Sequence, residues 1–226
     1  MKTQTLTHAT RRIFLAAAVA LGLAQSAHAE IYWTGAQSAA WNNKENWSGD
    51  SGYLVFRDSY AQSKYMEWSE RLTKFTYIGT SNYKALQFRG GTEAEPFVMN
   101  GKGYYYNCSG DTGSTANTRS KFAIADSTGD SALWFYNGTL KTRTFTAGTA
   151  SYSAWLKIGN GTDATSIENT VNDMTFTKGT FIVEANATAK TANSFRAGMD
   201  GASAQVDIKG TLTAGLMWRL AEPAPV

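Results

Sequence analysis

Three short repeats in the second half of the sequence constrain the fold more than any other feature. Each copy opens with apolar residues on either side of a variable one, passes through a polar turn and closes on Gly-Thr before Leu or Phe. The copies open at Phe122, Leu156 and Phe195 and close at Gly138, Gly179 and Gly210. A unit of short strands and a turn cannot bury its own apolar face, so successive copies must stack on one core. The repeats therefore predict an all-β solenoid.

The spacing within the repeats is uneven. From opening residue to closing glycine the copies span 16, 23 and 15 residues. Turns of a solenoid tolerate insertions because they project outward. The middle copy is therefore expected to hold an insertion of about seven or eight residues near Ser166 to Asp173.

Alternating polarity supports a chain built mainly of strands. Val206 and Ile208 alternate with Gln205, Asp207 and Lys209, and Lys84 to Arg89 shows the same period of two. Such alternation between Gly, Asn and Asp residues is typical of half-buried strands.

An antiparallel β-sandwich or jelly roll is the alternative fold. The segment Leu133 to Tyr136 is followed by Asn137-Gly138 and then Thr139-Leu140, a pattern typical of a two-residue hairpin. Asn100-Gly101 and Asn160-Gly161 offer further tight turns. The repeats favour the solenoid, because Asn-Gly also suits a solenoid corner.

Residues 1–29 have the pattern of a secretory signal. Arg11-Arg12 precede an apolar run from Ile13 to Ala24, and Ala27-His28-Ala29 then forms a cleavage pattern before Glu30. The twin-arginine route and the ordinary secretory route both fit. We expect cleavage between Ala29 and Glu30, and a final location in the periplasm, at the cell surface or outside the cell.

The expected domains are a signal at 1–29 and one β-rich domain at 30–226. The β-rich domain comprises a cap and first coils (30–110), the repeats (121–215) and a tail (216–226).

Composition narrows the chemistry of the mature segment. Three of the 21 basic residues and both histidines lie in the signal, which leaves 18 basic and 18 acidic residues and no histidine. A neutral segment without a basic cluster is a poor nucleic-acid binder. Catalytic mechanisms and zinc sites that need histidine are excluded.

The sequence offers few other candidates for a chemical site. Cys108 has no partner for an internal disulfide, and no second apolar run is long enough to span a membrane. We expect no catalytic residue, metal or cofactor; the acidic turns at Asp126 to Asp130 and Asn160 to Asp163 are interpreted as Asx turns rather than calcium sites.

The start of the mature segment resembles a known family. The residues are Tyr32-Trp33-Thr34-Gly35, Ala40-Trp41-Asn42 and Glu45-Asn46-Trp47-Ser48-Gly49, together with the later Gly210-Thr211-Leu212-Thr213-Ala214-Gly215. They resemble bacterial exported passenger-type proteins with autotransporter-associated β-strand repeats. The resemblance implies a right-handed parallel β-helix at or beyond the outer membrane, usually without enzymatic activity. Leu216 to Val226 shows neither the C-terminal barrel nor the sorting tail of that group.

Trp33, Trp41 and Trp47 carry two interpretations. Exposed tryptophans stack on sugar rings, which would make these three a glycan platform. Large aromatic residues are more often packed, and here they would plug the open end of the solenoid. We expect an exported, non-enzymatic solenoid with a structural or adhesive role, whose partner is a glycan or another surface protein. The alternatives are a secreted carbohydrate-binding module and a β-helix enzyme that degrades polysaccharide.

Overall fold

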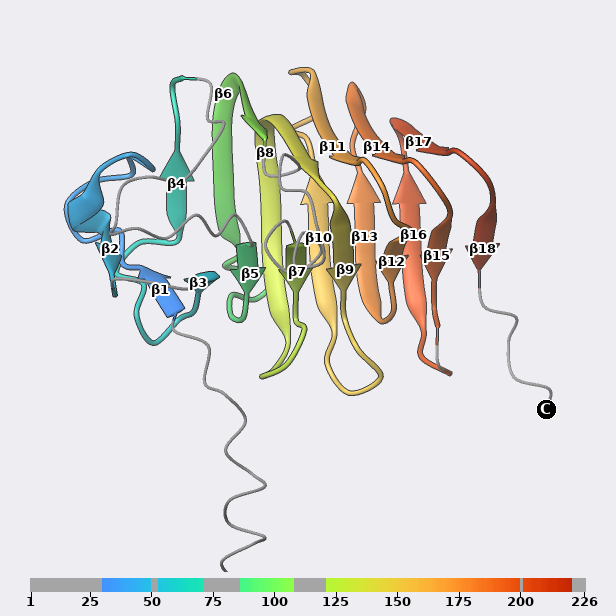
Figure 1. Ribbon diagram of the computed structural model, residues 1–226, viewed down its shortest axis with the longest axis horizontal. Coiled ribbons are helices and arrows are strands. Elements are labelled where there is room, and N and C mark those ends of the chain that lie inside the picture. The colour runs from blue at the N-terminus through green and yellow to red at the C-terminus, as the bar shows by residue number, and fades with distance from the viewer. Residues whose placement is uncertain (1–29, 50–52, 71–85, 108–120, 200, 221–226) are drawn as a thin grey trace, which may run out of the picture.

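Stacked parallel strands form most of the described structure. The computed structural model describes residues 30–49, 53–70, 86–107, 121–199 and 201–220. It is all-β and forms a β-solenoid of about six turns, which confirms the predicted fold class (Figure 1). One short 3-10 helix, η1 (Lys44–Asn46), is the only helix in these residues.

The strands lie in three stacks around one core. The first stack holds β1 (Glu30–Trp33), β3 (Tyr53–Phe56), β5 (Leu86–Phe88), β7 (Lys121–Ile124), β9 (Thr144–Ala147), β12 (Met174–Phe176), β15 (Phe195–Ala197) and β18 (Trp218–Leu220). The second holds β4 (Tyr65–Glu67), the first halves of β6 (Phe97–Asn107) and β8 (Ser131–Thr142), then β10 (Ala154–Ile158), β13 (Gly179–Val183) and β16 (Ala204–Ile208). The third holds the second halves of β6 and β8, then β11 (Thr165–Asn169), β14 (Ala187–Thr191) and β17 (Thr211–Ala214).

Inward-facing side chains of successive turns stack directly on one another. In the first stack Leu86, Phe122 and Phe145 occupy one register position on β5, β7 and β9, and all three are buried. The rings of Phe122 and Phe145 stack with centroids 5.4 Å apart, close to the spacing of about 4.8 Å between neighbouring strands. Each turn therefore covers the apolar face of the next.

The hairpin that the sandwich alternative requires at Asn137-Gly138 is absent, and that alternative is wrong. Residues 131–142 form one strand, β8, whose first half pairs with β10 and whose second half pairs with β11, both in parallel. Gly138 has φ of +109°, a region that favours glycine. A Cβ there would lie 2.9 Å from the carbonyl oxygen of Tyr104, so the glycine serves a close approach between turns.

The three repeats are not equivalent in the structure. Phe122 and Phe195 lie on β7 and β15 of the first stack, whereas Leu156 lies on β10 of the second. The insertion predicted near Ser166 to Asp173 is therefore wrong, because β11 begins at Thr165 and is equivalent to β14. The extra residues of this repeat lie partly in the corner between β10 and β11, which comprises residues 159–164. The equivalent corner of the next turn, between β13 and β14, comprises only residues 184–186.

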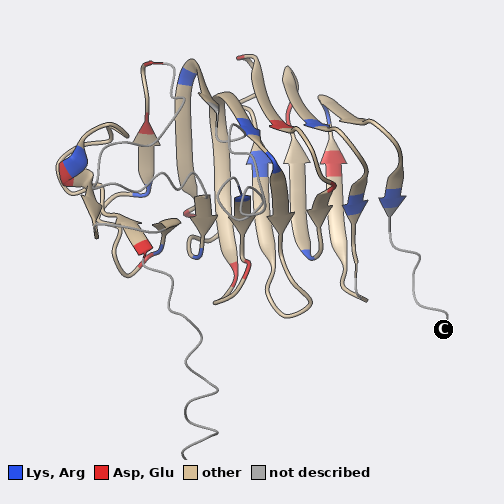
Figure 2. Ribbon diagram, in the orientation of Figure 1, with Lys and Arg blue, Asp and Glu red and all other residues tan. Residues whose placement is uncertain are grey.

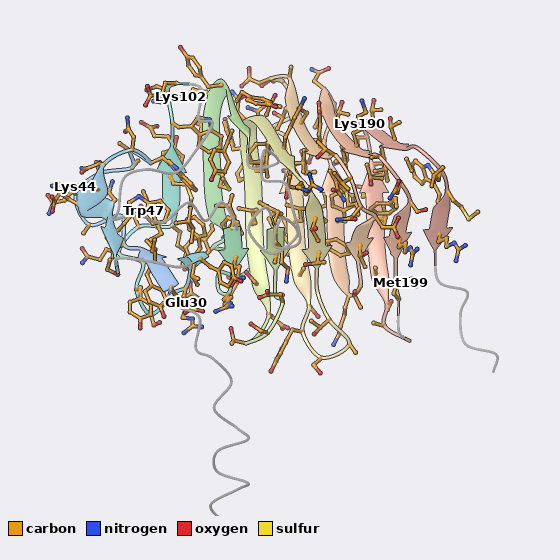
Figure 3. All side chains as sticks on the ribbon, viewed as in Figure 1. Glu30, Lys44, Trp47, Lys102, Lys190 and Met199 are labelled. Carbon is orange, nitrogen blue, oxygen red and sulfur yellow. The ribbon has the colours of Figure 1, made fainter. Side chains whose placement is uncertain are left out.

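The N-terminal end of the core is closed by tryptophans. Strand β2 (Trp47–Ser48) runs antiparallel to β1 and turns the chain back across this end. Trp33, Trp41 and Trp47 are only 0%, 1% and 7% exposed. The Trp47 ring lies edge-on to both of the others at 5.1 Å, and Trp47 Nε1 donates to the Trp41 carbonyl oxygen. Figure 3 shows Trp47 within this end of the molecule. The three tryptophans therefore pack as a plug in the core, and their buried rings leave no exposed face on which a sugar could stack.

The plug should carry a large share of the stability. Trp41→Ala is expected to lower the free energy of unfolding by about 3–5 kcal/mol, because it removes a buried ring from contact with other aromatics. Tyr104→Ala is the control, since Tyr104 is 47% exposed, and it should change stability by about 0.5 kcal/mol or less. Urea denaturation followed by circular dichroism measures both; equal effects would contradict the plug.

Candidate functional site

The outer face of the second stack carries a strip of aromatic and charged side chains. We call this the outer strip; it comprises Tyr65 and Glu67 on β4, Asn100 and Lys102 on β6, Trp134 and Tyr136 on β8, and Lys157 on β10. Register places Tyr65, Val98, Trp134 and Lys157 in one column along the axis. Tyr65 and Trp134 are therefore two turns, or about 10 Å, apart.

Four side chains form a hydrogen-bonded group at the β4–β6 end of the strip. The Tyr65 hydroxyl donates to Glu67 Oε2 at 3.1 Å and accepts from Asn100 Nδ2 at 2.8 Å. Lys102 Nζ lies 2.8 Å from Glu67 Oε1, and Lys102 sits at the upper end of β6 (Figure 3). Burial and the bond to Glu67 raise the pKa of Tyr65, and the bond to Glu67 raises the pKa of Lys102. Both groups stay protonated at neutral pH, so neither can act as a general base there.

Trp134 is the centre of a second group on β8 and β10. Its Nε1 donates to the Gly159 carbonyl oxygen at 2.9 Å, and its ring meets Tyr136 edge-on at 5.0 Å. Lys157 Nζ lies 4.8 Å from the centroid of the Trp134 ring, a cation–π distance. The tryptophan is held in one orientation by a hydrogen bond, a ring contact and a cation.

The charges continue along the axis as pairs of opposite sign. Glu184 lies 3.1 Å from Lys157 Nζ and 3.3 Å from Lys209 Nζ, which joins three successive turns. The hydrogen bond from Lys157, aided by Lys209, holds the pKa of Glu184 below its ordinary value although burial opposes this. Figure 2 shows basic and acidic segments spread along the molecule rather than gathered in one region.

A separate ionic group lies on the outer face of the first stack. Arg89 binds Glu30 and lies 3.4 Å from Asp126, which also contacts Lys121 at 3.1 Å. Burial raises the pKa of Glu30, but hydrogen bonds from Tyr32 and Arg89 outweigh it and lower the pKa overall. The hydrogen bond to Glu30 raises the pKa of Tyr32 to about 12. This group ties β1 to the turns that follow it, which is a structural role.

The acidic turns are occupied by the protein's own donors. The Asp126 carboxylate is paired with Arg89. In the other turn, Asn160 Oδ1 accepts hydrogen bonds from the backbone N–H groups of Thr162 and Asp163, both at 2.9 Å. The turn at Asn160 is therefore an Asx turn. Across the five described segments, no group of three or more His, Cys, Asp or Glu side chains could hold a metal ion.

The predicted site residues and the outer strip do not coincide. The three tryptophans lie in the core plug, Ala29 lies outside the described residues, and Glu30 begins β1. Alternation alone places Trp134 and Tyr136 on one face of a strand. The sequence analysis did not use this alternation, because the following Asn137-Gly138 is typical of a hairpin turn.

Comparison with protein families, with curated proteins and with solved structures finds no match to this chain. Within the described part of the chain, no helix has the length and apolar character needed to cross a membrane.

The charge pairs predict a measurable pH dependence. The pKa of Glu184 is lowered on folding from its ordinary value of 4.5. Its ion pairs therefore stabilise the folded protein fully at pH values above 4.5, and this stabilisation is lost as the pH falls through the pKa of the folded state. Glu184→Gln should lower the free energy of unfolding at pH 7 by about 1 kcal/mol or less, with a smaller difference in acid. Urea titrations at several pH values, with the exposed Glu93→Gln as control, measure this; a difference that grew in acid would contradict the assignment.

Proposed function

We propose that this chain is an exported β-solenoid without enzymatic activity that serves as a structural and adhesive element at the cell surface or outside the cell. It contacts its target through the outer strip. The secretory pattern of residues 1–29 supports export. The stacked turns supply a rigid scaffold that presents one outer face over several turns.

The pairing of charges on the outer strip carries the proposal. Glu67 is bound to Lys102 and Tyr65, and Lys157 is bound to Glu184. Tyr65 and Lys102 have pKa values moved further from neutrality, which suits hydrogen bonding and does not suit proton transfer. An ordered surface of aromatic rings and satisfied charges is suited to binding a partner without chemistry.

Protease shaving of intact producing cells tests the location. An adhesive element should be cleaved on intact cells, because its solenoid must face the medium to reach a target. A periplasmic protein that stays uncut until the outer membrane is opened is the control. Protection of this chain to the same extent, or its recovery from the medium alone, would contradict display at the surface.

A secreted carbohydrate-binding module is the second candidate, and exposed aromatic residues of β4 and β6 favour it. Tyr65 is 37% exposed and Tyr104 is 47% exposed. Aromatic faces stack on the apolar faces of sugar rings. Glu67, Asn100 and Lys102 lie beside Tyr65 and supply acceptors and donors for sugar hydroxyls.

Affinity electrophoresis against a panel of polysaccharides tests this candidate. Tyr65→Ala is expected to weaken retardation by about fivefold to tenfold, the loss of one stacked ring. Tyr60→Ala is the matched control, because Tyr60 is 43% exposed but stacks on Tyr32 of the first stack. Equal losses in the two variants, or no retardation of the unmodified protein by any polysaccharide, would remove the candidate.

A further inference from the structure

The charged side chains of the outer strip are all paired with charges of opposite sign in the described structure. At the β4–β6 end, Glu67 Oε1 lies 2.8 Å from Lys102 Nζ. Further along the axis, Lys157 Nζ lies 3.1 Å from Glu184. Each pair joins two successive turns, so it forms only when the turns stack. The strip therefore presents no net charge that would attract an ionic ligand.

The hydrogen-bonded group around Tyr65 keeps capacity to bind further donors and acceptors. Glu67 accepts one bond at each oxygen, from Tyr65 and from Lys102, and a carboxylate oxygen can accept more than one. Asn100 Nδ2 donates to Tyr65 and carries a second N–H, and Lys102 Nζ has further N–H groups. Acceptors and donors side by side match a hydroxyl group, which both donates and accepts. A carboxylate or sulfate only accepts, and Glu67 repels it.

The outer strip is long and narrow. It follows β4, β6, β8 and β10, which lie one after another along the axis (Figure 1). Four strands cover about 15 Å. Tyr65 and Trp134 stand in one register column, and Glu67 and Asn100 stand in the next. A linear chain of sugar rings can lie along such a strip, whereas a globular partner needs about 800 Å² of contact on each side.

Tyr65 rather than Trp134 is suited to stack on a sugar ring. Lys157 Nζ lies over the Trp134 ring at 4.8 Å, and Trp134 Nε1 donates to the Gly159 carbonyl oxygen. The Tyr65 side chain has no such cover from a cation and is 37% exposed. The stacking contact therefore lies at the β4–β6 end, beside the free donors and acceptors.

We propose that the outer strip takes an uncharged polysaccharide laid along the solenoid axis, and that Glu67 is the residue that keeps acidic polysaccharides out. The inference rests on the proposed function, since it names the chemical class of the target that the strip contacts. Tyr65 stacks on one sugar ring, and Glu67, Asn100 and Lys102 bind its hydroxyl groups. An acidic sugar would bring its carboxylate against Glu67, and like charges brought together lower the affinity for the wrong ligand.

Affinity electrophoresis of the full chain in gels that contain one polysaccharide each tests the proposal. The uncharged probes are dextran, galactomannan and hydroxyethylcellulose, and the acidic probes are alginate and polygalacturonate. We expect retardation by at least one uncharged probe and by neither acidic probe. The affinity for the uncharged probe should change by less than about twofold when the salt concentration is raised about tenfold, because no ion pair forms with the ligand.

Glu67→Gln gives the sharpest test, because it should create a new specificity. The amide keeps a donor and an acceptor, so binding of the uncharged probe should stay within about twofold. Lys102 loses its partner and becomes free to pair with a carboxylate, so retardation by alginate or polygalacturonate should rise about fivefold. Glu93→Gln is the matched control: it removes the same charge from an exposed position outside the strip and should gain nothing.

Three results would overturn the proposal, and they separate it from the proposed function. Retardation of the unmodified protein by an acidic probe, at least as strong as by any uncharged one, would overturn it while leaving carbohydrate binding in place. Equal behaviour of Glu67→Gln and Glu93→Gln on the acidic probes would overturn the role of Glu67. No retardation by any probe would overturn it together with the carbohydrate-binding candidate, whereas surface display is measured separately by protease shaving.

Discussion

Every turn of this protein has inward-facing side chains that only its neighbours along the axis can cover. Leu133, Leu156 and Phe181 lie in one column of the second stack and are fully buried, and burial of each such side chain is worth about 1.5–3 kcal/mol. No turn is stable alone, so a turn that lacks a neighbour on one side needs another cover for its inward-facing side chains. The tryptophan plug covers the core at the end formed by β1 and β2.

The corners between stacks are fixed by polar side chains turned inward. Asn169 is 2% exposed, and its Nδ2 donates to the carbonyl oxygens of Asn172 and Asp173. Thr191, its partner one turn later, donates to the Asn172 carbonyl oxygen at 3.0 Å. Such bonds satisfy buried backbone groups where the ladder is interrupted. The apolar columns and the polar corners together hold each turn in register, and this gives the outer strip its fixed spacing along the axis.

The sequence predicts the strands and their stacking because alternation and repetition are local signals. Leu86 and Phe88 face inward as expected, and Val206 and Ile208 pack against the core. It does not predict which stack a strand joins. Gly-Thr before Leu or Phe occurs at Gly138, Gly179 and Gly210. Gly179 begins a strand of the second stack, whereas Gly138 begins the third-stack half of β8 and Gly210 precedes β17. It also does not predict that Lys157 covers Trp134, because this contact arises from register between residues 23 positions apart.

Parallel register between successive turns is the central claim, and an engineered disulfide tests it most directly. Ser166 and Thr188 are register partners on β11 and β14, with Cα atoms about 4.8 Å apart, within disulfide range. In a Cys108→Ser background, Ser166→Cys with Thr188→Cys should oxidise to an internal disulfide without loss of structure. Thr139→Cys with Thr188→Cys, two turns apart, should not. A disulfide in the second pair, or none in the first, would contradict the stacked solenoid.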